Sequence, residues 1–90
     1  MKIEASELTV ANVAPLVDSG LAAIHAGDLT FDLSAVKAVD SAAIALLLTW
    51  QRAAQTVGKR IAMTGCPPGL MSLAKLYGVD QLLAVHPHDS

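Results

Sequence analysis

The residues with the clearest chemical potential in this chain are Asp40 and Ser41, which stand directly before an apolar run. From Ala42 to Leu48 no side chain is polar, so the pair marks the start of an apolar helix. The first backbone N–H groups of a helix lack internal partners, and an Asp or Ser there contributes about 1 kcal/mol as a cap. A hydroxyl at this positive end is also well placed to receive a phosphate or to hydrogen-bond a partner protein. The spacing alone fits a cap and a functional hydroxyl equally well.

Other reactive side chains do not form a recognisable catalytic or metal-binding group. Cys66 is the single cysteine and is expected to be a small, buried or half-buried residue. His86 and His88 could both touch a metal, but we expect them to belong to a disordered end. His25 suits a helix C-terminus, where it interacts favourably with the dipole, and Asp32 faces outward or bonds to the following loop. We therefore predict no enzyme activity, no cofactor and no bound metal.

Size and composition favour one small folded domain, residues 1–90, with residues 86–90 as a flexible tail. Hydrophobic residues make up 53 % of the 90 residues, too many for a disordered chain, and the net charge is only -2. Three aromatic residues and no basic stripe argue against nucleic-acid binding. The apolar runs are shorter than the roughly 20 residues that cross a bilayer, and the first residues do not resemble a signal peptide. We expect a cytoplasmic protein that is not inserted into a membrane.

Alternating and helical apolar periods predict an α/β domain. Residues 2–8, 29–36 and 61–64 alternate like strands. The helical segments are 12–25, 42–57 and 69–77, and they are expected to end at Gly27, Gly58 and Gly78. Residues 79–85 fit either a short strand or a turn of helix. Strands that alternate with helices favour a small mixed β-sheet with the helices packed mainly on one side.

The helix over residues 42–57 carries two apolar stripes rather than one. The first stripe consists of Ile44, Leu47, Leu48 and Ala54, and the second of Leu46, Trp50, Ala53 and Val57. A helix on one sheet covers one such stripe, so part of this helix is expected to meet a partner, with Trp50 as an interface residue. The alternative is that helix 12–25 or helix 69–77 covers the second stripe.

The segment "FDLSAVKAVDSAAIALLLTWQ" resembles the core of STAS domains, the sulfate-transporter and anti-sigma-factor-antagonist fold. In that family a strand ends in Asp-Leu-Ser, and Asp-Ser or Asp-Thr opens the next helix. "SELT" resembles the turn before the first helix, with Thr9 in place of an Asp, and the likeness extends over nearly the whole chain. The family often has Gly where this chain has Ala43, which makes close approach of a partner backbone slightly harder. The resemblance implies that the first stripe packs on the sheet and leaves Leu46, Trp50 and Ala53 outward.

The segment "SLAKLYGVDQLL" is most similar to the branch that forms the STAS subunit of Mla-type phospholipid ABC transporters. This resemblance implies a non-enzymatic cytoplasmic subunit that binds the transporter's ATPase (MlaF-like), lies peripheral to the inner membrane within the permease complex, and supports assembly or activity. In the anti-sigma-factor antagonists the position of Ser41 is instead phosphorylated by a partner kinase, and a homodimerising module is a third reading. The expected partner-binding residues are Asp40, Ser41, Ala42, Leu46, Thr49, Trp50 and Ala53.

Overall fold

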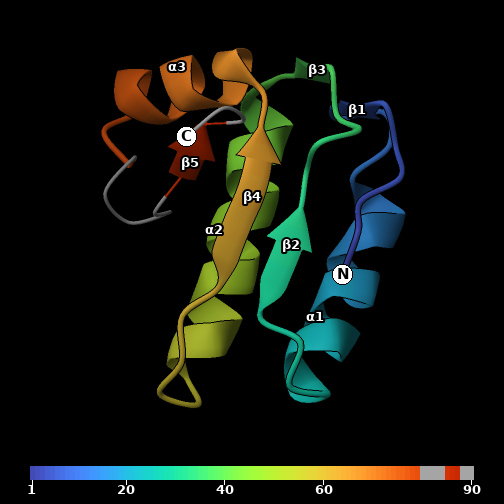
Figure 1. The fold of residues 1–90 in the computed structure, drawn as a ribbon, viewed down its shortest axis with the longest axis vertical. Helices are drawn as coiled ribbons and strands as arrows, with labels where there is room; N and C mark the ends of the chain where they lie inside the picture. The colour runs from blue at the N-terminus through green and yellow to red at the C-terminus, as the bar shows by residue number, and fades with distance from the viewer. Residues whose placement is uncertain (80–84, 88–90) are drawn as a thin grey trace.

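The computed structural model describes residues 1–79 and 85–87, and for 85–87 it describes the backbone alone. The helices in this part of the chain are α1 (Ala14–His25), α2 (Ser41–Gln55) and α3 (Pro68–Leu76). The strands are β1 (Glu7–Leu8), β2 (Thr30–Asp32), β3 (Ala38–Val39), β4 (Ala62–Cys66) and β5 (Val85–Pro87) (Figure 1). None of the described helices is long and apolar enough to span a bilayer.

The strands form two small groups. β2, β4 and β5 make one sheet in the order β2-β4-β5, while β1 pairs with β3. Every pairing among the described strands is parallel, and so is the isolated bridge that joins Lys2 to Asp32 beside β2. The sheet that the sequence predicted as mixed is therefore parallel throughout the described residues. The carboxyl ends of β2 and β4 consequently lie at the same end of the molecule.

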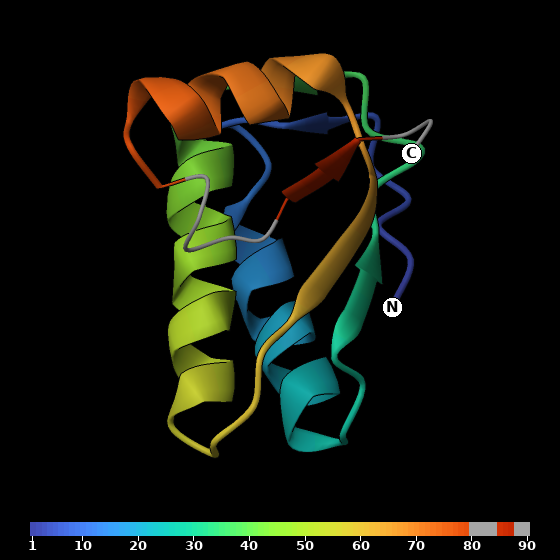
Figure 2. The same cartoon turned by 60° about the vertical axis from the view of Figure 1, so that its left-hand side comes forward.

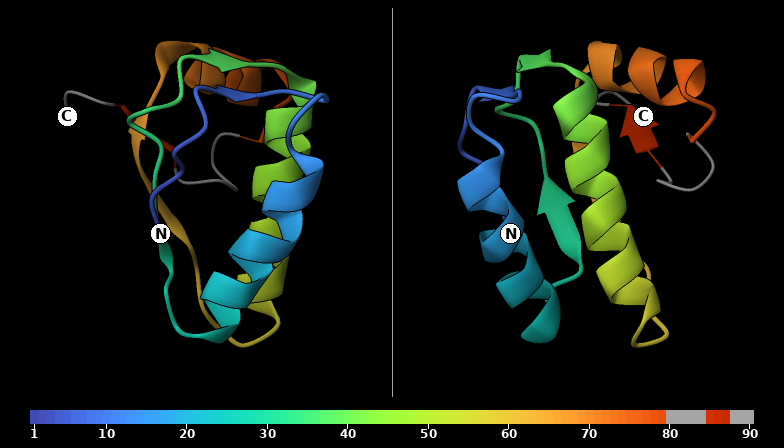
Figure 3. Two further views of the ribbon diagram at one scale, coloured as in Figure 1. Left: turned by 90° about the vertical axis from the view of Figure 1, so that its right-hand side faces the viewer. Right: turned by 180° about the vertical axis from the view of Figure 1, so that it is seen from behind.

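The helices cover one face of the sheet and one end of it. α1 and α2 lie side by side behind β2 and β4, and α3 crosses the end at which β4 finishes (Figures 2 and 3). The α/β class and the packing of helices mainly on one side are thus confirmed.

The core lies between this face of the sheet and the two long helices. Alternate residues of the strands point into it, because successive side chains of a strand face opposite sides. The largest fully buried side chains are Trp50, Phe31, Ile3, Leu8, Leu33, Leu47, Ile61, Met63 and Leu70. Cys66 is buried among them, as expected.

Helix boundaries agree with the sequence-based expectation to within about two residues. Pro15 lies in the first turn of α1, where its missing N–H costs no hydrogen bond. Gly27 and Gly58 follow α1 and α2 with φ of 92° and 72°, the left-handed conformation that ends a helix.

The strands differ more from the expectation. The predicted strand 29–36 is only Thr30–Asp32, because the Ser34 backbone N–H turns back to donate to Asp32 Oδ1 at 2.9 Å. β3 was not predicted. His86 and Pro87, expected in a flexible tail, form part of β5, whereas residues 80–84 and 88–90 lie outside the described residues.

Candidate partner-binding surface at the start of α2

Asp40 is the N-cap of α2. Its Oδ1 accepts a hydrogen bond of 2.8 Å from the Ala42 backbone N–H, and its backbone is extended with φ -133° and ψ -168°. Asp40 is half-buried, and its other carboxylate oxygen accepts a hydrogen bond of 3.2 Å from the Val10 backbone N–H. One side chain therefore satisfies the start of α2 and also fixes the loop that precedes α1.

Ser41 is the first residue of α2 and is exposed. Because Asp40 serves as the cap, Ser41 is not needed for that purpose. Within the described residues, no group exchanges a hydrogen bond with the Ser41 hydroxyl. The hydroxyl therefore stands at the positive end of a 15-residue helix and is available to a partner.

The predicted outward orientation of Leu46 and Trp50 is wrong. Leu46 is 2 % exposed and Trp50 is fully buried, with its ring stacked on Phe31 at a centroid distance of 4.7 Å. The Trp50 Nε1–H donates to the Val17 carbonyl of α1 at 3.1 Å. The alternative interpretation, in which another helix covers the second stripe, is correct for Trp50, which α1 covers. A Trp50→Ala variant would therefore test the core rather than an interface.

The outer face of α2 consists of its exposed residues, which recur at helical spacing: Ser41, Ala45, Thr49, Arg52 and Gln55. Of the predicted site residues, Ser41 and Thr49 lie on this face, while Ala42 and Ala53 are half-buried at its margin. Thr49 Oγ1 donates to the Ala45 carbonyl at 2.9 Å, so its hydroxyl is occupied within the helix.

Small side chains dominate the N-terminal half of this face. One of them, Ala45, was not among the partner-binding residues expected from the sequence. The polar residues Ser41, Thr49 and Arg52 mark the same arc, so their spacing would have identified it. Ala43, which was expected to hinder a partner's approach, is fully buried and therefore does not face a partner.

Asp32 bonds to the loop that follows β2, one of the two orientations expected for it. Hydrogen bonds from Ser34 lower the pKa of the Asp32 carboxyl, and the charge of Lys2 lowers it further. The role of this carboxylate is to close the turn that leads from β2 toward β3. No three His, Cys, Asp or Glu side chains in the described part of the chain gather closely enough to hold a metal ion.

The sequence of the chain also matches a known protein family. The family model that describes the MlaB STAS domain matches residues 5–84, which is most of the chain. No curated protein matches the chain significantly. The matched segment includes β1, the α2 start with its Asp-Ser pair and the whole of α3. The chain therefore belongs to the STAS domain family, close to MlaB.

Proposed function

We propose that this chain is a non-enzymatic accessory subunit that binds the ATPase of a phospholipid-transporting, Mla-type ABC transporter. It would support the assembly or activity of the complex and lie peripheral to the inner membrane through it. The match to the MlaB domain model supports this class of partner. The observation that carries the choice of surface is the exposed Ser41 hydroxyl, which has no partner within the described residues.

The surface around Ser41 suits a close protein contact. Ala42, Ala45 and Thr49 are small, so a partner's backbone or side chains can approach α2 closely along its first three turns. The hydroxyl supplies a directional hydrogen bond, and the helix end favours an acceptor with negative charge. Asp40 keeps the helix start rigid, which limits the conformational entropy lost on binding.

The first test is the affinity of the purified chain for the ATPase subunit, with Ser41→Glu as the variant. A Glu in the first turn interacts favourably with the helix dipole, so the fold should be retained. The longer, charged side chain should clash at the interface and weaken binding at least tenfold. Gln55→Glu adds the same charge near the other end of α2 and should bind like the unmodified chain.

A pull-down from native cytoplasmic and detergent-solubilised membrane extract identifies the partner independently. Recovery of an ABC ATPase together with its permease would support the proposal. If Ser41→Glu binds the ATPase as well as the unmodified chain does, the interface lies on another surface.

The alternative is an anti-sigma-factor antagonist in which a kinase phosphorylates Ser41. The exposure of the hydroxyl favours this reading as well, because a kinase must reach it. Phosphate would add about -1.5 to -2 charge beside the Asp40 carboxylate and disrupt an apolar contact. Recovery of a small ATP-binding kinase, with phosphate found on Ser41 by mass spectrometry, would support this alternative over the transporter proposal.

A further inference from the structure

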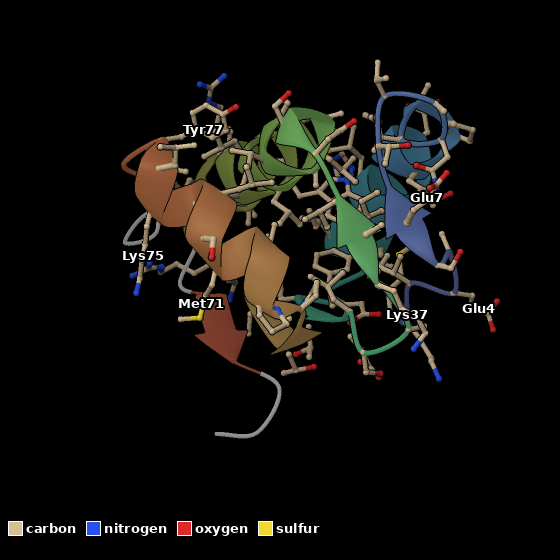
Figure 4. All side chains as sticks on the ribbon, turned by 90° about the horizontal axis from the view of Figure 1, so that it is seen from above. Glu4, Glu7, Lys37, Met71, Lys75 and Tyr77 are labelled. Carbon is tan, nitrogen blue, oxygen red and sulfur yellow. The ribbon has the colours of Figure 1, made fainter. Side chains whose placement is uncertain are left out.

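Four large apolar side chains are exposed in the described part of the chain: Val10, Val57, Leu76 and Tyr77. Leu76 and Tyr77 lie at the C-terminal end of α3, far from β1 (Figure 4), and close in sequence to residues 80–84, which are outside the described part. Val57 follows α2 at the end opposite Ser41. Val10 is the one of the four whose backbone contacts the cap of α2.

Val10 is 81 % exposed, although its backbone is firmly held. Its N–H donates to Asp40 Oδ2, and the neighbouring Thr9 N–H donates to Asn12 Oδ1 at 2.9 Å. The Asn12 amide in turn donates to the Glu7 carbonyl. The loop is thus fixed at both ends while its apolar side chain is left in solvent.

The apolar side chains beside Val10 are small, and the charged group that contacts its backbone is the Asp40 carboxylate. Ala11 is the next residue in the loop and is exposed, and Ala42 lies on the other side of the Asp40 carboxylate. Both Asp40 oxygens accept backbone hydrogen bonds, so this carboxylate is already satisfied within the chain. The side chain of Val10 is larger than those of Ala11 and Ala42, and it lies next to the cap of α2.

We propose that Val10 is a second contact for the ATPase subunit and enters an apolar recess on the same surface of that subunit that receives Ser41. This inference rests on the proposed function, since Val10 and Ser41 flank Asp40 and one partner would cover both. A prearranged apolar side chain gains binding free energy on burial without the cost of ordering its loop. The Val10 position would thereby add an apolar requirement to the hydrogen bond of Ser41.

The test compares Val10→Ala with Val57→Ala in the full chain, with the affinity for the purified ATPase subunit as the readout. The two substitutions remove the same atoms from two exposed valines, 81 % and 61 % exposed, at opposite ends of α2. Neither should change the unfolding midpoint in urea appreciably. We expect Val10→Ala to weaken binding about tenfold and Val57→Ala to leave it unchanged.

The outcomes separate this inference from the proposed function. Equal affinities of the two alanine variants, with Ser41→Glu still weakened, would overturn the role of Val10 and leave the transporter proposal standing. If neither Ser41→Glu nor Val10→Ala changes the affinity, both assignments of the surface are wrong. Failure of the unmodified chain to bind the ATPase would overturn the proposed function and the Val10 contact together.

Discussion

At the scale of single residues, Trp50 is a side chain that the sequence predicted at an interface but that the fold buries in its own core. Its indole fills the space between Phe31 of β2 and α1, and its N–H reaches the Val17 carbonyl. The close packing depends on Gly20, since a Cβ at that position would lie 2.0 Å from Trp50 Cε2. A glycine in the middle of α1, normally unfavourable in a helix, is therefore required by the indole.

Gly20→Ala is expected to destabilise the protein by about 1–3 kcal/mol, because the added methyl group overpacks the core by more than the helix propensity of Ala can offset. Urea unfolding measures the change. Gly69→Ala in α3 is the matched control, since its Cβ would make an ordinary contact of 3.6 Å with Val39 Cγ2. A Gly20→Ala variant as stable as Gly69→Ala would show that the indole moves aside without cost.

At the scale of elements, α2 does more than present its outer face. Gln51, 2 % exposed, accepts a hydrogen bond of 2.9 Å from the Ile61 backbone N–H just before β4. This contact fixes where β4 begins relative to α2. The same helix thus positions the strand at one side and the small residues near Ser41 at the other.

Gln51→Leu is expected to lower the free energy of unfolding by about 1–3 kcal/mol, because the buried Ile61 N–H loses its acceptor. Amide hydrogen exchange at Ile61 should accelerate more than exchange in α1. Gln55→Leu, at an exposed position on the same helix, serves as the control and should change neither quantity much. Unchanged protection of the Ile61 amide in Gln51→Leu would contradict the assignment.

At the scale of the whole molecule, the parallel sheet places the loops after its strands and the start of α2 at the same end. The carboxyl ends of β2 and β4 lead there to the Asp32 turn and to α3, and α2 starts there with Ser41 (Figures 1 and 4). Such ends are where α/β proteins commonly place their binding residues, because the loops and helix N-termini converge. The proposed partner surface occupies the edge of this end where β1, β3 and α2 meet.

The Asp32 turn makes stability depend on pH. Hydrogen bonds from Ser34 lower the pKa of Asp32 in the folded state, so the carboxylate contributes stability above its ordinary pKa. That contribution is lost as the pH falls through the lowered value. Asn at this position keeps an acceptor for the Ser34 N–H but does not titrate.

We expect Asp32→Asn to lose less stability than the unmodified chain between neutral pH and a pH well below the usual carboxyl value of about 3.9. Urea unfolding at the two pH values, for both proteins, measures the difference. An equal acid loss in both would show that this carboxyl does not contribute to the pH dependence.

The sequence by itself determined the features that depend on neighbouring residues. Helix ends follow from caps and from glycines that adopt positive φ, the α/β class follows from the two apolar periods, and the Asp-Ser pair identifies the start of α2. The resemblance to the STAS family lies in the same local segments. The match of the family model to residues 5–84 agrees with it. The exposed position of Ser41 was expected on this basis.

Only the tertiary structure decided which side of α2 is free. Two apolar stripes on one helix show how much surface must be covered but not which element covers it. Here Leu46 and Trp50 are both buried, and the Trp50 indole contacts α1. The exposure of Val10 likewise follows from the tertiary structure, whereas the spacing of the polar residues of α2 could have identified Ala45. Pairing of β1 with β3 depends on segments about 30 residues apart, and no local pattern encodes such a contact.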